Sequence, residues 1–589
     1  MMTPFVATLV AGIVLFGGES SPAIASTPPD ACTSPVGGPV KPAVVPSRIS
    51  GVAPLAVFFD ATGTTASTTP RPFHDLEYRW DFGDPAAGAT WAAGSRPKLS
   101  SRNSATGPVA AHVFEAPGIY TVTLTVNTAK SSCVITVQDP DAVFSGASTI
   151  CFSTSGDFTG CPAGAEQFKT SDFAAVTNAA NAYNKTRRLL LRRGETWTAA
   201  KSAVLKASGP GIVGAFGAGA APVVDAIVNG VVLQLSGAND WRIMDLNIVG
   251  NGGTGQRGFR NTTVATRITF LRISTSNLAI GFLVDIGQSA DMENTFADLN
   301  VVNSGSYGLF VGGTRLAILG SIIRNVGTEH IFRSAVIVKG VISNNEFSGG
   351  VAGKSIVKLN APKNGTGLSE QIVISDNELQ GGGTHWTANL GPQSGNPPNN
   401  NEIVRQAIVE RNWFRAGART QRALVINASE ITVRNNICDM TRPGGTGATC
   451  FAVFTQGAEP APDNVHVYNN TGYSADSGDF SFIHFADSTA TNVTVQNNLA
   501  SAPRSTRARM IHGTPASGLV QSNNSSDSQV VSLVPGWIVP APKTPAEFKL
   551  GPESRYIDAG FAVPVFSDFF RTSRPRGAQI DIGAAERER

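Results

Sequence analysis

Six residues, Val465-His-Val-Tyr-Asn-Asn470, carry the pattern that decides the fold of this chain of 589 residues. Val465 and Val467 alternate with other residues, as in a strand that buries one face, and the Asn pair that follows is typical of a turn. An apolar residue three positions before an Asn returns at intervals of roughly 20–35 residues, which is the spacing of a repeat architecture. The repeated segments are Ile322–Asn325, Ile342–Asn345, Ile374–Asn377, Val409–Asn412, Val433–Asn436, Val467–Asn470 and Val495–Asn498.

Repeats of this length predict a solenoid, because one coil cannot bury its inward row of Val and Ile side chains alone. Stacked coils join those rows into a continuous core. They also align the Asn residues, which can adopt a left-handed backbone and hydrogen-bond to the next Asn along the axis. Scarce regular Leu positions exclude a leucine-rich repeat, and the period-2 alternation excludes helical repeats. The variable interval predicts a parallel β-helix over residues 145–589.

Three further segments resemble known proteins of this kind. Leu189–Trp197 is similar to the entry strand of the pectate-lyase-like right-handed parallel β-helix proteins. Tyr556–Gly560 and Ile580–Ala584 are similar to the closing segment of their exported bacterial members. The resemblance implies a right-handed β-helix in a carbohydrate-active bacterial protein. It does not select an activity, because this fold hosts lyases, hydrolases, epimerases and adhesins.

Residues 47–138 predict a separate β-sandwich. Tyr120–Val126 alternates strictly between apolar residues and Thr, and Tyr78–Asp84 (YRWDFGD) has the form of a strand that ends in a turn. These two segments resemble the PKD domain, with Pro85 where that pattern usually has Gly. The resemblance implies an immunoglobulin-like sandwich that serves as a spacer or attaches the protein to polymers. The predicted fold class of the whole chain is therefore all-β.

The first 46 residues have the form of an export signal followed by a linker. Phe5–Phe16 is apolar but too short to span a bilayer, and Ala23-Ile-Ala25 matches a cleavage pattern, so residues 1–25 are the expected signal peptide. Residues 26–46, rich in Pro, Ser and Gly, are the expected linker. No later segment is apolar enough to cross a membrane. We expect a secreted protein, either extracellular or periplasmic.

Six cysteines agree with export. Two pairs are close in sequence, and the other two cysteines bracket the predicted sandwich. Six cysteines allow fifteen sets of pairings, but this clustering favours three local disulfides in an oxidising compartment. A zinc site is a poor interpretation because the sequence has no CxxC motif. The expected disulfides are Cys32–Cys133, Cys151–Cys161 and Cys438–Cys450.

The charge of the chain excludes a nucleic-acid-binding footprint. The formal net charge is only +3, and no block of Lys or Arg occurs. A weak basic excess is compatible with an acidic sugar polymer, although many proteins with neutral substrates share it. We expect an extracellular polysaccharide as the partner, no nucleic acid, no membrane span, and a monomer.

Outward polar residues of neighbouring coils would line a groove, and the segment Glu329-His-Ile-Phe-Arg333 is the first candidate. It places a carboxylate, an imidazole and a guanidinium within five residues. His330 could act as a base near neutral pH, and Arg333 could hold a substrate carboxylate with two hydrogen bonds. The alternative is that Glu329 and Arg333 form a surface ion pair while His330 fills a turn.

The second candidate lies one coil later, in Lys354–Leu359. Alternation places Val357 and Leu359 on one face and Lys354, Ile356 and Lys358 on the other. If the first set points inward, both lysines face the same outer surface near the first candidate. Two cations there would suit a polyanionic chain, whereas two solvated lysines are the alternative.

The third candidate is the long loop of residues 381–401, rich in Gly, Asn and Pro. Loops of this length inside a compact repeat are often functional. Trp386 could stack on a sugar ring, and His385 could be a second acid or base. Arg411, in the next turn, could supply a further wall of the groove. The alternative is that Trp386 packs on its own coil.

These residues favour elimination over hydrolysis. A lyase on a uronic-acid polymer must neutralise the carboxylate, remove the C5 proton and protonate the leaving oxygen, and His, Lys and Arg can supply these roles. A glycosidase needs two well-placed carboxylates, for which Glu329, Asp376 and Glu410 are the candidates. A hydrolase and a non-catalytic polysaccharide-binding adhesin stay open as alternatives.

The sequence thus predicts a polysaccharide lyase that cleaves a uronic-acid polymer by β-elimination. The sequence offers no metal-ligating set, and Ca²⁺ stays open as a cofactor because no dense Asp-rich repeat supports it. The predicted catalytic residues are His330, Arg333, Lys358 and Glu329. The predicted substrate-binding residues are Lys354, His385, Trp386 and Arg411.

Overall fold

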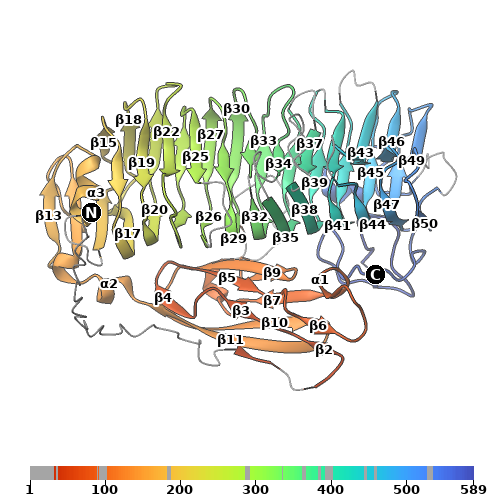
Figure 1. Ribbon diagram of the computed structural model, residues 1–589, viewed down its shortest axis with the longest axis horizontal. Coiled ribbons are helices and arrows are strands. Elements are labelled where there is room, and N and C mark those ends of the chain that lie inside the picture. The colour runs from red at the N-terminus through yellow and green to blue at the C-terminus, as the bar shows by residue number, and fades with distance from the viewer. Residues whose placement is uncertain are drawn as a thin grey trace, which may run out of the picture.

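Two all-β units, a sandwich and a long solenoid, make up the computed structural model (Figure 1). The structure describes the chain except for residues 1–31, 35–36, 89–90, 92–101, 182–186, 285–291, 335, 361–366, 383–385, 392–401, 419, 443–446, 457–459, 527–534 and 589. The predicted signal peptide and the first residues of the predicted linker lie outside the described residues. No helix among the described residues is long and apolar enough to cross a membrane.

The sandwich consists of sheets closed over one core, in which every pairing is antiparallel except that of β4 with β11, which is parallel. Its strands are β1 (Cys32–Thr33), β2 (Val40–Lys41), β3 (Val45–Pro46), β4 (Ser50–Val52), β5 (Leu55–Asp60), β6 (Thr65–Ala66), β7 (Tyr78–Asp81), β8 (Ser104–Thr106), β9 (Val109–Phe114), β10 (Gly118–Val126) and β11 (Ala129–Gln138). One sheet has the order β1-β11-β10-β7-β8 with β4 beside β11, and a second has the order β3-β5-β9. The predicted inward row of β10, from Tyr120 to Val126, is buried.

The described part of the expected linker is not a linker. Within residues 32–46, β1 pairs with β11, β2 with β6 and β3 with β5. These backbone hydrogen bonds hold the segment in the sandwich, although its Pro, Ser and Gly content predicted a linker. The composition was misleading because short edge strands tolerate such residues.

Three short helices lie outside the sheets. α1 (Pro72–Asp75) belongs to the sandwich, α2 (Pro140–Val143) follows it, and α3 (Ala174–Asn181) lies at the first coils of the solenoid. Val176 and Ala180 of α3 are buried in the solenoid core. The helix therefore covers the end of the core that would otherwise face water.

The predicted parallel β-helix is confirmed: successive strands enter sheets I, II and III in turn, and every pairing within these sheets is parallel. Within the described residues, sheet I has 15 strands and sheets II and III have 12 each. Sheet I contains β12 (Thr149–Ser153), β13 (Glu166–Lys169), β14 (Arg187–Arg192), β17 (Ser208–Phe216), β20 (Asn239–Met244), β23 (Thr269–Leu271), β26 (Thr295–Ala297), β29 (Gly313–Leu319), β32 (Ile337–Ser343), β35 (Gly367–Ser375), β38 (Glu402–Glu410), β41 (Ser429–Arg434), β44 (Asp463–Tyr468), β47 (Thr491–Gln496) and β50 (Val520–Ser522).

Sheets II and III complete each coil. Sheet II contains β15 (Thr196–Ala199), β18 (Val223–Ala226), β21 (Asn247–Gly250), β24 (Ser274–Ser276), β27 (Asn300–Ser304), β30 (Ile322–Val326), β33 (Glu346–Ser348), β36 (Glu378–Gln380), β39 (Trp413–Arg415), β42 (Ile437–Asp439), β45 (Thr471–Tyr473) and β48 (Leu499–Ser501). Sheet III contains β16 (Ala203–Leu205), β19 (Val231–Leu235), β22 (Arg257–Asn261), β25 (Ile280–Val284), β28 (Leu309–Val311), β31 (Phe332–Arg333), β34 (Val357–Leu359), β37 (Trp386–Leu390), β40 (Arg422–Ile426), β43 (Ala448–Val453), β46 (Phe480–Phe485) and β49 (Ala508–His512).

A ladder of buried Asn side chains runs along the turn from sheet I to sheet II. Each amide nitrogen donates to the next side-chain oxygen over 2.9–3.1 Å. The left-handed conformation belongs to the residue before each ladder Asn, as in Asn344 with φ 61°. Asn325 is not a member, because Ser321 occupies its place and donates its backbone N–H to Asn345 over 2.9 Å. The ladder consists of Asn345, Asn377, Asn412, Asn436, Asn470, Asn498 and Asn524.

Asn436→Ala should destabilise the solenoid strongly. The Asn436 amide donates to Asn470, Val409 and Arg434 and accepts from Asn412, in a site closed to water. Each buried group left unpaired costs about 1–3 kcal/mol. Denaturant unfolding should show this loss, whereas the exposed Asn300→Ala should change the free energy of unfolding by less than about 0.5 kcal/mol. Equal effects of the two substitutions would contradict a stabilising ladder.

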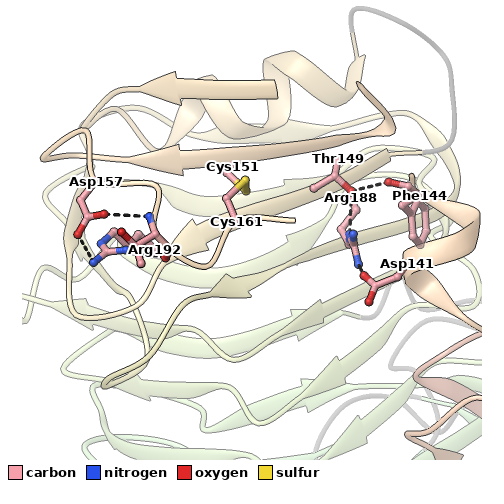
Figure 2. Close-up of a disulfide and its surroundings, with 9 residues drawn as sticks. Asp141, Phe144, Thr149, Cys151, Asp157, Cys161, Arg188 and Arg192 are labelled. Carbon is pink, nitrogen blue, oxygen red and sulfur yellow. Dashed lines mark hydrogen bonds and ion pairs between the residues drawn. A yellow bond between two sulfur atoms is a disulfide. The ribbon is translucent and has the colours of Figure 1, made fainter. Parts of the chain in front are cut away.

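The three expected disulfides are confirmed. Cys32–Cys133 joins β1 to β11, Cys438–Cys450 joins β42 to β43 inside the solenoid, and Cys151–Cys161 closes a loop on the first coil. Figure 2 shows Cys151–Cys161 between an Arg192–Asp157 ion pair and the side chain of Arg188. Arg188 donates to Asp141 of α2 over 2.6 Å and to Thr149 over 2.8 Å, so it ties the end of the sandwich to the first coil.

The sandwich packs directly along the outer face of sheet I (Figure 1). Apolar residues of β5 and β9, among them Phe58 and Val113, share one core with Leu319, Val341 and Val373 of sheet I. Ion pairs surround this contact, including Arg48–Asp240 at 2.7 Å and Arg102–Asp298 at 3.0 Å. The spacer role implied by the resemblance does not describe this arrangement, because a sandwich buried against the solenoid cannot act as a flexible tether.

The C-terminal segment covers the far end of sheet II. Tyr556 and Ile582, from the two segments that resembled a closing unit, form an apolar cluster with Trp413, Ile437 and Tyr473 of sheet II. A short 3-10 helix, η3 (Pro545–Phe548), contributes Phe548 to the same cluster. Sheet I and the end of sheet II are thereby closed to a polymer.

Candidate functional site

Neither the sandwich nor the C-terminal segment covers the outer face of sheet III in the described part of the chain. In Figure 1 the sandwich lies below the row of sheet I strands, whereas β37, β43, β46 and β49 of sheet III lie on the far side of the solenoid. Parallel pairing aligns outward residues of this sheet in columns, and successive residues of a column are about 4.8 Å apart. Among the described residues, sheet II is also uncovered before β39, but Arg333 and Lys358 lie on strands of sheet III, so the candidate groove is on that face.

Two of the predicted catalytic residues lie in one such column. Phe310 of β28, Arg333 of β31 and Lys358 of β34 are paired in register and are all partly exposed. The predicted inward residues Val357 and Leu359 are buried in the core. Arg333 and Lys358 therefore point to the same outer surface, as their alternation with apolar residues indicated.

Arg333 is held by aromatic groups that the sequence interpretation missed. Its Nη1 donates to the Tyr307 hydroxyl over 3.0 Å, and its guanidinium carbon lies 5.1 Å from the centre of the Phe310 ring. Tyr307 is partly exposed and precedes β28, one coil before Arg333. Counting back one repeat length from Arg333 would have identified it. The pair joins a cation to a phenol oxygen that can exchange a proton.

Glu329 and Lys354 form their own pair beside this column. Lys354 Nζ donates to Glu329 Oε2 over 2.7 Å, so Glu329 is not the partner of Arg333. Both side chains are partly exposed. Lys354 and Lys358 are both partly exposed, but Ile356, which was predicted to share their face, is buried in the core just before β34 begins.

His330 fills the turn before β31 and is almost completely buried. Its Nδ1–H donates to the Ser355 carbonyl oxygen over 2.8 Å. Burial lowers the pKa of His330 to about 3; the Ser355 carbonyl opposes this shift, and the charges of Lys358 and Arg333 add to it. The imidazole is therefore neutral at neutral pH and is a weak base.

The remaining predicted binding residues separate in space. His385 lies outside the described residues. Trp386 begins β37 and is partly exposed, with Phe454 5.8 Å away between ring centres. Arg411 is a correction: only 1% of its surface is exposed, under the sandwich, where it pairs with Asp376 and Glu410. It occupies the turn that follows sheet I, which faces away from the groove.

The same burial removes two of the three carboxylates available for hydrolysis. Asp376 and Glu410 are 5% and 2% exposed and belong to the ion cluster under the sandwich. Within the described residues, no group of three or more His, Cys, Asp or Glu side chains could hold a metal ion. The outer face of sheet III is thus dominated by cations, aromatic rings and imidazoles.

Further along sheet III, four residues that the sequence interpretation missed gather near Trp386. They are Arg422, Phe454, His484 and His512, and each is at least partly exposed. The His484 and His512 rings are stacked with centres 4.4 Å apart. Burial, then the charges of His512 and Arg422, lower the pKa of His484 to about 4. Only the alignment of strands brings these residues together, because 27–36 residues separate the paired positions of neighbouring coils.

Comparison with known proteins agrees with the two-part architecture. Residues 43–140 match the PKD domain family, so the sandwich is a PKD domain. The solenoid that follows it is a parallel β-helix. No curated protein matches the chain in sequence.

Solved β-helix structures share the fold at low sequence identity. Pectate lyase Pel9A is 14% identical, with 75% of this chain and 96% of that chain covered and a TM-score of 0.35. The Azotobacter vinelandii mannuronan C-5 epimerase AlgE4 A-module is 14% identical, with 65% and 100% covered and a TM-score of 0.36. The GH136 lacto-N-biosidase from Eubacterium ramulus is 10% identical, with 64% and 67% covered and a TM-score of 0.39.

Proposed function

We propose that this protein is an exported polysaccharide lyase that cleaves a uronic-acid polymer by β-elimination on the outer face of sheet III. The observation that carries the proposal is the column in which Arg333 contacts the Tyr307 hydroxyl and lies one strand from Lys358. Export is supported by three disulfides and by the cleavage pattern at Ala23–Ala25.

The cations suit the first requirement of elimination. Arg333 and Lys358 would neutralise the substrate carboxylate, which makes the C5 proton more acidic. Glu329 does not oppose them strongly, because Lys354 compensates its charge at 2.7 Å. Arg333 can bind a carboxylate with two parallel hydrogen bonds, whereas Lys358 acts as a point charge.

Tyr307 is the proposed base in place of His330. The Tyr307 oxygen accepts a hydrogen bond from the Arg333 guanidinium over 3.0 Å and so lies beside the column of cations, whereas the burial of His330 makes its imidazole a weak base. The C5–H and C4–O4 bonds break, a C4=C5 double bond forms, and the proton taken by Tyr307 passes to the leaving O4. The step balances without an oxidant or a cofactor. His330 then serves to position the turn that holds Arg333.

Incubation with polygalacturonate, alginate and neutral dextran tests the proposal. The expected result is ultraviolet absorbance from unsaturated uronate ends with one of the acidic polymers and none with dextran, measured with and without added Ca²⁺. New saturated reducing ends would contradict elimination and indicate a hydrolase. Binding of the acidic polymers without any new ends would contradict cleavage and indicate a binding protein.

A further inference from the structure

We propose that the outer face of β37–β49 carries a second subsite for an anionic sugar unit, centred on Arg422 and separate from the Arg333 column. The distal subsite is defined by Trp386, Arg422, Phe454, His484 and His512. The inference rests on the proposed function for its ligand, an acidic polysaccharide, but binding there can be measured without turnover.

Two columns of residues point outward here, and the exposed or partly exposed members are Trp386, Arg422, Arg509, His484 and His512. In β40 both Ala423 and Leu424 point into the core, and the same holds for Cys450 and Phe451 of β43. Two successive inward residues turn the positions on both sides of them outward. The first outward column contains Trp386, Arg422, Thr449, Ser481 and Arg509, and the second contains Asn389, Val425, Ala452, His484 and His512.

Arg422 is held between two aromatic rings. Its guanidinium carbon lies 4.9 Å from the centre of the Phe454 ring and 5.7 Å from that of Trp386. Among the described residues it has neither a carboxylate partner nor a hydrogen-bond acceptor. By contrast, Arg415 and Arg405 are each ion-paired at 2.9 Å. A guanidinium held between aromatic rings and without an acceptor is suited to an external anion.

The two histidines extend the same surface with groups that bind hydroxyls. His484 and His512 lie in one column, and Ser481 Oγ is 3.4 Å from His512 Nδ1, so both columns meet here. Neutral imidazole offers one donor and one acceptor to a sugar. The ten outward residues of the two columns include no carboxylate, and Arg422 and Arg509 give the face a positive charge. The ligand class is therefore a sugar that carries a carboxylate or a sulfate.

The column also relates this subsite to the proposed catalytic residues. Register pairing runs without a break through Arg333, Lys358, Asn389, Val425, Ala452 and His484. Five steps of about 4.8 Å separate Arg333 from His484, which is about 24 Å. Asn389, Val425 and Ala452, which lie between Lys358 and His484 in this column, are 0% exposed, so the two places are separate exposed surfaces. An extended polymer would have to pass over this covered stretch to contact both, and a short oligomer could contact only one.

The test is direct binding by the full chain, measured by isothermal titration calorimetry. The probes are polygalacturonate and alginate for a carboxylate ligand, dextran sulfate for a sulfate ligand, and neutral dextran as the control polymer. Arg422→Ala should weaken binding of the preferred anionic polymer by about tenfold or more. Arg415→Ala is the matched control: it also stacks on a ring, 4.6 Å from Trp413, but lies on sheet II and should leave the Kd within about twofold.

Each possible result of this test either supports or contradicts the distal subsite. An effect of Arg422→Ala with dextran sulfate but not with the polyuronates would assign a sulfate ligand. Equal affinity of wild type, Arg422→Ala and Arg415→Ala for every polymer would overturn the subsite. Measuring unsaturated ends in parallel separates the two proposals. Arg422-dependent binding without cleavage would refute the lyase alone, and cleavage that ignores Arg422 for both long and short substrates would refute the subsite alone. Arg422→Gln should also bind the polymer more weakly. An unfolding midpoint equal to that of the wild type would confirm that this variant loses binding without losing its fold.

Discussion

Tyr307→Phe is expected to lower the kcat for formation of unsaturated ends by about 10²–10⁴-fold, the usual contribution of a positioned base. The substitution removes only the hydroxyl to which Arg333 donates over 3.0 Å. The ring, 5.2 Å from Phe310 between centres, is retained, so the fold and the KM should change little. Initial rates on the cleaved polymer, with KM measured separately, check this expectation.

His330→Asn is the comparison that separates a base from a positioning residue. Because burial lowers the pKa of His330 to about 3, the wild-type pH profile should show no ionisation of this group near pH 6.5. Its replacement should lower kcat by less than about tenfold. A full loss of activity in His330→Asn together with wild-type activity in Tyr307→Phe would reverse the assignment. Arg333→Ala should raise KM and lower kcat together, because Arg333 contacts both the substrate carboxylate and the base.

Arg411→Ala is expected to destabilise the protein by about 3–5 kcal/mol, the cost of breaking a buried ion pair. Arg411 donates to Asp376 over 3.1 Å and lies 2.8 Å from Glu410, and it also contacts Thr106 of the sandwich. Its removal leaves two buried carboxylates with less compensation, at the contact between the two units. Denaturant unfolding followed by tryptophan fluorescence should show the loss, together with separate transitions for sandwich and solenoid.

Arg405→Ala is the matched control for Arg411→Ala. Arg405 lies on the same sheet and pairs with Glu370 at 2.9 Å, but 45% of its side chain is exposed. Exposed pairs contribute about 0–1 kcal/mol, so this substitution should have a small effect. Similar losses for the two variants would contradict a special role of burial at the sandwich contact.

The ion cluster around Arg411 should also make the stability of the protein depend on pH in a defined direction. Burial alone would raise the pKa of Glu410, but Arg411 and Arg434 outweigh it and lower the value from 4.5 to about 2. A carboxyl whose folded pKa is depressed contributes stability that is complete above the unfolded value and is lost as the pH falls through the folded value. The free-energy difference between wild type and Glu410→Gln should therefore shrink between about pH 4.5 and pH 2. A constant difference would contradict it.

Local sequence patterns predicted the architecture well, because they report burial in single strands. The Val and Asn repeat around Val465–Asn470 indicated both the parallel β-helix and the ladder, and alternation placed Val357 inward and Lys358 outward. The errors occurred at turns. Asn325 lies within a strand of sheet II, not in the turn after a strand of sheet I, and Ile356 lies just before β34, where strict alternation does not apply.

The candidate site could be predicted only in part, for a different physical reason. Glu329, Arg333 and Lys354 were identified because they are close in sequence. Tyr307 and the group around Arg422 were missed because loops of variable length separate neighbouring coils, so sequence distance does not report spatial distance. Arg411 was misplaced because its sequence context shows a turn but not the domain that covers it.

The sequence determined three properties. It showed that the chain forms a sandwich and a solenoid, it indicated how the cysteines pair, and it indicated which side chains of each strand point into the core. These properties follow from contacts within a strand, within a turn or between one coil and the next. Tertiary structure alone decided which parts of the three long faces are covered. The PKD domain covers sheet I and the C-terminal segment covers the end of sheet II, so the outward columns of sheet III carry the proposed chemistry. That choice depends on packing between segments far apart in sequence, which no local pattern records.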